Sequence, residues 1–121
     1  MLARCKKGID EPVRDKGAAF SSGERQLISF ARTLYANPKI LILDEATSHI
    51  DTETEEMIQK AMAVVKEGRT TFIIAHRLST IQDADQILVI SEGKIVERGQ
   101  HDTLVKQNGI YAQMSRLQQQ V

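Results

Sequence analysis

The stretch ILILDEA, residues 40–46, decides how this sequence folds. Its apolar residues predict a short, buried strand. The strand runs directly into Asp44 and Glu45, so two acidic side chains follow its carboxyl end. Such a pair suits Mg²⁺ and water chemistry, in which one carboxylate enters the shell of the metal and the next orients or deprotonates a water. The same pattern also fits a strand that leaves the core through a solvated acidic loop.

A helix is predicted upstream of this strand, beginning in the stretch FSSGERQL, residues 20–27. Ser21 and Glu24 have the spacing of a capping box, and apolar residues follow at helical intervals. Proline disfavours a helical conformation in the residue before it. The helix should therefore end near Asn37, which precedes Pro38.

The start of this helix is a candidate anion site. A helix N-terminus presents N–H groups without intrahelical acceptors and about half a positive charge. Ser21, Ser22 and Gly23 add hydroxyl groups and bare backbone, which a phosphate contact needs. The alternative is a capped surface helix in which Ser21 and Glu24 satisfy only each other.

Helical and extended patterns alternate after the acidic pair. Asp51 or Thr52 can cap a second helix that Gly68 should end, and a strand at 70–75 leads to His76. The remaining expected elements are a helical turn at 78–82, a strand at 86–91, a turn at 92–93, a strand at 94–98 and a helical tail from 102, interrupted at 108–109.

This order predicts an α/β fold, with a parallel sheet of βαβ units, a C-terminal hairpin and a helical tail. Ligands of such sheets bind beyond the carboxyl ends of the strands. Asp44, Glu45 and His76 should therefore meet at one edge of the sheet. His76 can hydrogen-bond a terminal phosphate there, or it can be a satisfied loop residue. His49 and His101 are interpreted as loop residues.

Composition excludes several function classes. Lysine plus arginine and aspartate plus glutamate number 16 each, so the formal net charge is zero and nothing indicates nucleic acid or an anionic membrane surface as a partner. Cys5 is the single cysteine, which excludes an internal disulfide framework. The longest apolar runs fall far short of the roughly 20 residues that span a bilayer. We therefore expect a cytosolic chain.

Four motifs in order resemble the second half of the nucleotide-binding domain of ATP-binding cassette (ABC) transporters, a P-loop NTPase fold. The resemblance runs from about residue 8 to the C-terminus, with motifs from about 20 to 99 and a helical tail at 102–121, so residues 1–121 are expected to be the C-terminal portion of one such domain. The tail indicates the exporter branch. The motifs are FSSGERQLISFARTL, NPKILILDEATSHID, TTFIIAHRLSTI and ADQILVISEGKIVERGQHDTLV.

The resemblance implies roles around bound ATP and Mg²⁺. Ser21, Ser22, Gly23 and Glu24 would form the signature loop, which contacts the γ-phosphate of an ATP held mainly by a partner domain. The remaining assignments are Asp44 as the Walker B aspartate in the Mg²⁺ shell, Glu45 as the catalytic base, Ser48 to Asp51 as the D-loop that communicates across the dimer, and His76 as the switch histidine that reads the γ-phosphate.

The larger departure of the sequence from the family is an absence. It contains no G-x-x-x-x-G-K-[ST] loop, which holds the β- and γ-phosphates in this family. We therefore expect this chain to be the C-terminal part of a longer exporter subunit, anchored at the cytoplasmic face of the membrane by a transmembrane domain. The isolated chain should neither bind ATP tightly nor hydrolyse it, because phosphoryl transfer depends on positioning and charge stabilisation.

The signature also departs, reading Phe20-Ser21-Ser22-Gly23-Glu24 where the family has L-S-G-G-Q. A carboxylate near a phosphate is unfavourable unless it turns away, for instance to cap its own helix. In exporters built from two different halves, a deviant signature often accompanies an intact catalytic glutamate and histidine, so the second nucleotide-binding domain is expected to come from a different subunit.

Two further interpretations remain open at the sequence level. The chain can be an inert or docking product of a truncated transporter gene, or part of a soluble ABC ATPase that works on DNA ends or ribosomes. Against the last, the neutral charge gives no basic footprint for nucleic acid.

Overall fold

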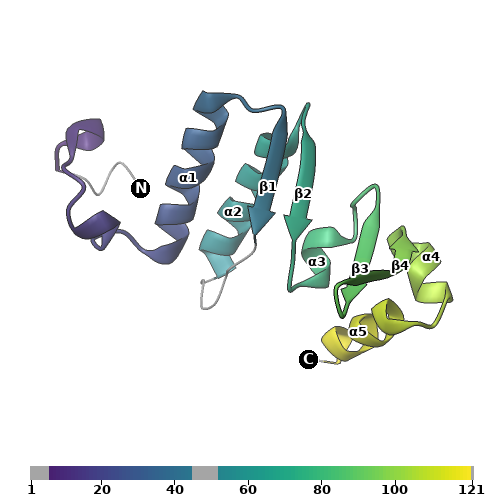
Figure 1. Cartoon of the computed structure of the whole chain (residues 1–121). Coiled ribbons are helices and arrows are strands. Elements are labelled where there is room, and N and C mark those ends of the chain that lie inside the picture. The colour runs from purple at the N-terminus through teal and green to yellow at the C-terminus, as the bar shows by residue number, and fades with distance from the viewer. Residues whose placement is uncertain (1–5, 45–51, 121) are drawn as a thin grey trace. The chain divides into compact units, whose positions relative to one another are not determined.

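The structure is a computed structural model, and it describes residues 6–44 and 52–120. The chain divides into two compact units, Met1–Phe72 and Ile73–Val121. Helices and strands alternate along it, so the predicted α/β class is confirmed (Figure 1). None of the described helices has the length and apolar content that crossing a membrane requires.

The first unit begins with two short 3-10 turns, Gly8–Asp10 and Asp15–Gly17, followed by helix α1, Ser22–Ala36. Helix α1 ends as predicted, because Asn37 adopts the left-handed conformation with φ 48° and its N–H donates to the carbonyls of Thr33 and Leu34. Asparagine tolerates this conformation better than most residues, and the next residue, Pro38, cannot continue a helix.

Strand β1, Ile40–Asp44, helix α2, Thr52–Lys66, and strand β2, Thr70–Ile74, complete the βαβ unit that the alternation predicts. The two strands are hydrogen-bonded neighbours and run in the same direction (Figure 1). Within the described residues, sheet pairing is limited to β1 with β2 and β3 with β4, so the parallel part of the fold is this one pair.

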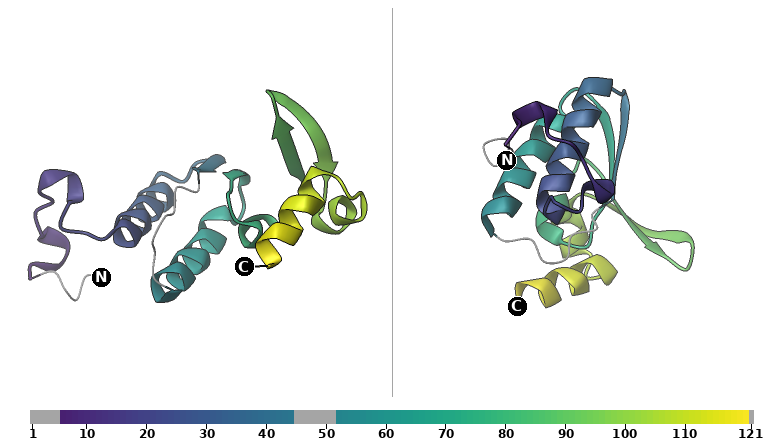
Figure 2. Two further views of the ribbon diagram at one scale, coloured as in Figure 1. Left: turned by 90° about the horizontal axis from the view of Figure 1, so that it is seen from below. Right: turned by 90° about the vertical axis from the view of Figure 1, so that its left-hand side faces the viewer.

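The core of the first unit lies between the helices and one face of β1 (Figure 2). Its buried members come from α1, β1 and α2, and Leu27, Leu43 and Ala61 pack around them. Burial of apolar surface at roughly 25 cal/mol per Å² is the main force that holds the helices to the strand. The buried members are Phe30, Leu41, Ile58, Met62 and Val65.

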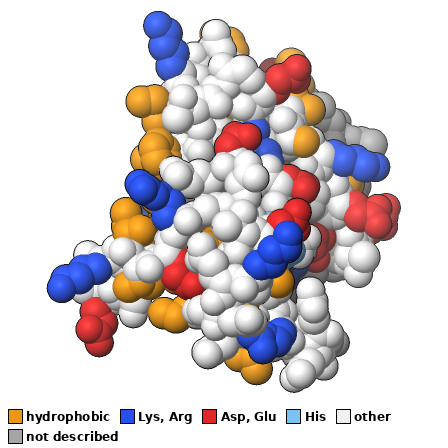
Figure 3. Space-filling view, turned by 90° about the vertical axis from the view of Figure 1, so that its right-hand side faces the viewer, with side chains coloured by type: hydrophobic (Ala, Val, Ile, Leu, Met, Phe, Trp, Pro, Cys, Tyr) orange, Lys and Arg blue, Asp and Glu red, His pale blue; other side chains and the backbone are white. Residues whose placement is uncertain are grey.

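The prediction that β1 is a buried strand is wrong for its second face. Side chains alternate across a strand, so helices on one side bury only every other residue. Leu41 is buried, whereas Ile40 and Ile42 are 63% and 68% exposed. Apolar side chains are also visible on the face of the molecule shown in Figure 3.

The second unit contains an antiparallel hairpin and three helices. Strand β3 pairs with β4 from Ile87 opposite Gly99 to Ser91 opposite Lys94, with a bulge after Val89. Glu92 and Gly93 both have positive φ, at 49° and 74°, which is the backbone that a two-residue hairpin turn requires. The elements are α3, Leu78–Ile81; β3, Ile87–Ser91; β4, Lys94–Gly99; α4, His101–Lys106; and α5, Ile110–Gln119.

Interpreting His101 as a loop residue was wrong, because it is the first residue of α4. Its Nδ1 atom lies 2.8 Å from the hydroxyl oxygen of Tyr111, and the two rings meet edge to face. Tyr111 is buried in a second core with Leu78, Ile87 and Leu104. His101 therefore connects the start of α4 to α5.

Candidate functional site

The start of α1 is a complete capping box. The backbone N–H of Glu24 donates to Ser21 Oγ at 3.1 Å, and the backbone N–H of Ser21 donates to Glu24 Oε2 at 3.1 Å. The carboxylate of Glu24 is thus turned onto the start of its own helix, which is the condition under which we expected it to be compatible with a nearby phosphate.

The capping box leaves two first-turn amides for another acceptor. Intrahelical bonding begins with the N–H of Arg25, which donates to the Ser21 carbonyl at 2.9 Å. Since Ser21 and Glu24 use their own N–H groups in the box, the N–H groups of Ser22 and Gly23 are the first-turn donors that helix geometry leaves without an intrahelical acceptor. Ser22 is exposed, so an anion can approach this end of the helix.

Gly23 also has a packing role that the sequence did not reveal. It is buried, and a Cβ atom placed on it would collide with the Cγ2 methyl of Thr54 on α2. The absence of a side chain at Gly23 therefore lets α1 and α2 approach closely at their first turns. The lack of a side chain at Gly23 is therefore required for helix packing, in addition to any role in ligand binding.

The acidic cluster is described only at Asp44. Asp44 is the last residue of β1 and is exposed, whereas Glu45, Ser48 and Asp51 lie outside the described residues. Helix α1 and strand β1 run in opposite directions, so the capping box and Asp44 belong to the same end of the first unit (Figure 1). Within the described ranges, no three His, Cys, Asp or Glu side chains gather as metal ligands.

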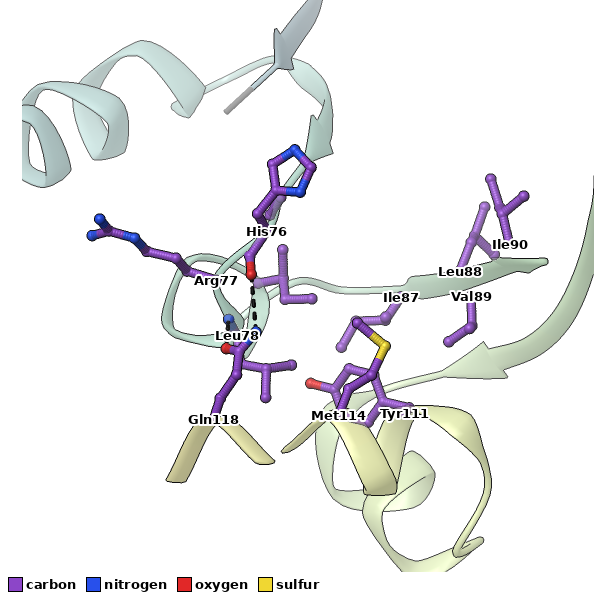
Figure 4. A pocket seen from close by; sticks show the side chains of 12 residues that line it. His76, Arg77, Leu78, Ile87, Leu88, Val89, Ile90, Tyr111, Met114 and Gln118 are labelled. Carbon is purple, nitrogen blue, oxygen red and sulfur yellow. Dashed lines mark hydrogen bonds between the residues drawn. The ribbon is translucent and has the colours of Figure 1, made fainter. Parts of the chain in front are cut away.

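His76 belongs to the second unit, where it follows β2 and precedes α3. It is exposed, and its imidazole points away from α5 while its main chain faces that helix (Figure 4). The His76 carbonyl accepts a hydrogen bond from Gln118 Nε2 at 2.9 Å. Sequence reasoning missed Gln118, because it lies in the run LQQQ, residues 117–120. Only its helical spacing from Tyr111 distinguishes it from the neighbouring glutamines.

The pKa of the buried Tyr111 phenol is shifted. Burial disfavours its charged form and raises the pKa of Tyr111 above the ordinary value of 10.0. The group therefore stays neutral at physiological pH and acts as a hydrogen-bond partner of His101.

Comparisons with known proteins agree with these motifs. The sequence profile of the ABC transporter family matches residues 2–48. A probable multidrug resistance ABC transporter ATP-binding/permease protein, YheH, of Bacillus subtilis is 66% identical over 118 residues, covering 98% of this chain and 18% of that protein. An ATP-dependent lipid A-core flippase of Aliivibrio fischeri is 52% identical over 111 residues, covering 92% of this chain and 19% of the flippase.

A solved structure shares the fold. The chain superimposes on a bacterial Atm1-family ABC exporter with ATP bound at a TM-score of 0.83, with 47% sequence identity, covering 97% of this chain and 20% of the exporter chain. The α/β fold is thus that of the nucleotide-binding domain of a P-loop NTPase. The chain belongs to the ABC transporter family, and it spans about a fifth of the length of the relatives that it matches.

Proposed function

We propose that this chain is the ATP-binding and ATP-hydrolysing segment of an ABC exporter subunit, which powers transmembrane transport within the full-length protein. We also propose that residues 1–121 form the C-terminal portion of one nucleotide-binding domain. The two sequence relatives named above support this, since each combines identity above 50% with a name that specifies an ATP-binding or ATP-dependent protein.

The start of α1 is the observation that carries the proposal. Ser21 and Glu24 satisfy each other, the carboxylate is turned onto the helix, and the N–H groups of Ser22 and Gly23 remain for an acceptor. These amides and the positive end of the helix dipole would contact the γ-phosphate of ATP. In this proposal Ser21, Ser22, Gly23 and Glu24 complete a nucleotide site held mainly by the partner domain.

The other site residues would act on the metal ion, the water and the phosphate. Asp44 offers an exposed carboxylate, the hard oxygen donor that Mg²⁺ prefers, and would hold the ion. A bound Mg²⁺ neutralises charge on the phosphates. Glu45 would orient and deprotonate the attacking water, Asp51 would communicate across the dimer, and His76 would hydrogen-bond the γ-phosphate.

Two partners follow from this assignment. A transmembrane domain in the same chain would place the segment at the cytoplasmic face of the membrane. A second nucleotide-binding domain would supply the remainder of the ATP site, and the departure of the signature at Ser22 and Glu24 favours a different subunit in that place. Purification of the assembled transporter with two identical copies of this subunit would contradict the heterodimer.

The catalytic assignment is tested by Glu45→Gln in the full-length subunit, assembled with its partner in membrane vesicles or detergent. We expect ATP binding to persist and ATP turnover to fall to background, because the amide cannot accept the proton of the water. The matched control is Glu53→Gln, an exposed acid in the first turn of α2, which should leave turnover unchanged. Full turnover in Glu45→Gln would overturn the assignment.

A further inference from the structure

We propose that Gln118, near the end of α5, is a positioning residue that holds the main chain of His76 in place for the reaction; this inference rests on the role proposed for His76. The carboxamide of Gln118 forms two hydrogen bonds to one short segment. Its Nε2 donates to the His76 carbonyl at 2.9 Å, and its Oε1 accepts from the Leu78 N–H at 2.8 Å (Figure 4).

The chemistry of the segment fixes the orientation of this carboxamide. The His76 carbonyl can only accept and the Leu78 N–H can only donate, so an amide with one donor end and one acceptor end satisfies both at once. The flipped amide would face oxygen with oxygen and N–H with N–H. Glutamine is therefore the side chain that matches both groups. Its two partners are the residues immediately before and after Arg77.

The segment needs this contact because α3 has no cap of its own. Helix α3 begins at Leu78, and its N-cap residue Arg77 makes no side-chain capping bond. First-turn N–H groups have no intrahelical acceptor, so the Leu78 N–H requires a partner from elsewhere. Gln118 supplies it from a position 40 residues further along the chain.

Gln118 lies on helix α5, one face of which is buried. Tyr111, Ser115 and Gln118 lie at i, i+4 and i+7, which places them on one face of α5. Tyr111 and Ser115 are 2% and 4% exposed, and the Tyr111 N–H donates to Glu97 Oε2 at 2.9 Å. The packing of the buried face of α5 thus fixes the position of Gln118.

A pocket that is partly open to solvent lies beside the segment. This pocket of about 160 Å³ is lined by residues 75–78 together with parts of α3, β3 and α5, including Tyr111 and Met114 (Figure 4). Leu78 is buried in the core with Tyr111, whereas His76 is exposed, so packing alone does not fix the main chain at His76. The two hydrogen bonds of Gln118 set the position of the His76 main chain, and the imidazole points away from α5.

The test uses the full-length exporter subunit with two substitutions. Gln118→Met keeps the length of the side chain and removes both hydrogen bonds. Gln118→Glu keeps an acceptor for the Leu78 N–H and loses the donor to the His76 carbonyl. Gln119→Met, an exposed neighbour on α5, is the matched control.

Hydrogen–deuterium exchange of residues 75–80 reports on the contact itself. We expect Gln118→Met to speed exchange at Leu78 by several-fold to about tenfold, Gln118→Glu by less, and Gln119→Met not at all, because only Gln118→Met removes the acceptor of the Leu78 N–H. Unchanged exchange in Gln118→Met would overturn the inference.

ATPase kinetics report on the reaction. We expect Gln118→Met to lower kcat by several-fold to about tenfold with little change in KM for ATP, because His76 is proposed to act on the phosphate during transfer, and Gln118→Glu to recover part of the loss. His76→Ala separates the two proposals. If His76→Ala abolishes turnover while Gln118→Met leaves kcat unchanged, the positioning role is wrong; if His76→Ala retains full turnover, the role proposed for His76 is wrong.

Discussion

The Nδ1 atom of His101 lies 2.8 Å from the hydroxyl oxygen of Tyr111, with the ring centroids 5.7 Å apart and the planes at 78°. A buried tyrosine hydroxyl requires a partner, and here the first residue of α4 provides it. Helices α4 and α5 are thereby joined through a polar contact at the margin of an apolar core. This contact gives the second unit a measurable response to alkaline pH.

Deprotonation of Tyr111 should destabilise the second unit. Burial raises the pKa of Tyr111 in the folded state above 10.0, so its contribution to stability is complete below pH 10 and is lost as the pH rises through the folded pKa. Tyr35 is the other tyrosine, and Tyr35→Phe leaves Tyr111 as the sole reporter. Tyrosinate absorbance of this variant should rise above pH 10 together with the loss of helical circular dichroism. Ionisation below pH 10 with the helices intact would contradict it.

Replacing Gly23 with alanine should destabilise the first unit. The added methyl collides with Thr54 Cγ2, so either the Thr54 side chain or the two helices must shift at their first turns. We expect a loss of about 1–3 kcal/mol in the free energy of unfolding, measured by urea denaturation. Thr54→Ser removes the colliding methyl, and the double variant should recover most of the loss. No recovery would mean that Gly23 is needed for another reason.

Replacing Arg69 with lysine should also destabilise this unit, because one guanidinium serves four acceptors. Its Nη1 donates to the carbonyls of Val65 at 2.7 Å and Glu67 at 3.2 Å, its Nε to the Pro38 carbonyl at 3.0 Å, and its Nη2 to Asn37 Oδ1 at 3.0 Å. These contacts tie the end of α1 to the end of α2.

A lysine ammonium cannot span these acceptors, so Arg69→Lys should lower the free energy of unfolding by about 1–3 kcal/mol. Arg32→Lys, at an exposed position on α1, is the control and should change stability by less than about 0.5 kcal/mol. Equal effects of the two substitutions in urea denaturation would show that the four contacts contribute nothing specific.

The 121-residue chain alone should not bind Mg-ATP tightly. It contains no phosphate-holding G-x-x-x-x-G-K-[ST] loop, and the α1 amides offer only a partial cradle. Isothermal titration calorimetry should detect no dissociation constant in the micromolar range. Micromolar affinity would mean that these residues hold the nucleotide without that loop.

Local signals predicted the fold well. Ser21 and Glu24 marked the start of α1, the Asn37-Pro38 pair marked its end, and Glu92 with Gly93 marked the hairpin turn. Each of these signals acts within a few residues, so the sequence pattern contains the physical cause.

The missed features all depend on contacts between distant segments. Gln118 pairs with His76 and Leu78, Arg69 reaches back to Pro38, and the space left by Gly23 is filled by Thr54. No local pattern distinguishes Gln118 from the glutamines beside it. The exposure of one face of β1 could not be predicted either, because an apolar run does not indicate which of its two faces the helices will cover.

The contact between Gly23 and Thr54 also has a consequence for comparing natural sequences. The two positions share one small volume, so an increase in size at one must be matched by a decrease at the other. Relatives that carry alanine or serine in place of Gly23 should therefore carry a residue without a γ-methyl in place of Thr54, and the two alignment columns should covary. Such a signal would reflect helix packing rather than nucleotide chemistry, although one of its columns lies in the candidate ATP contact.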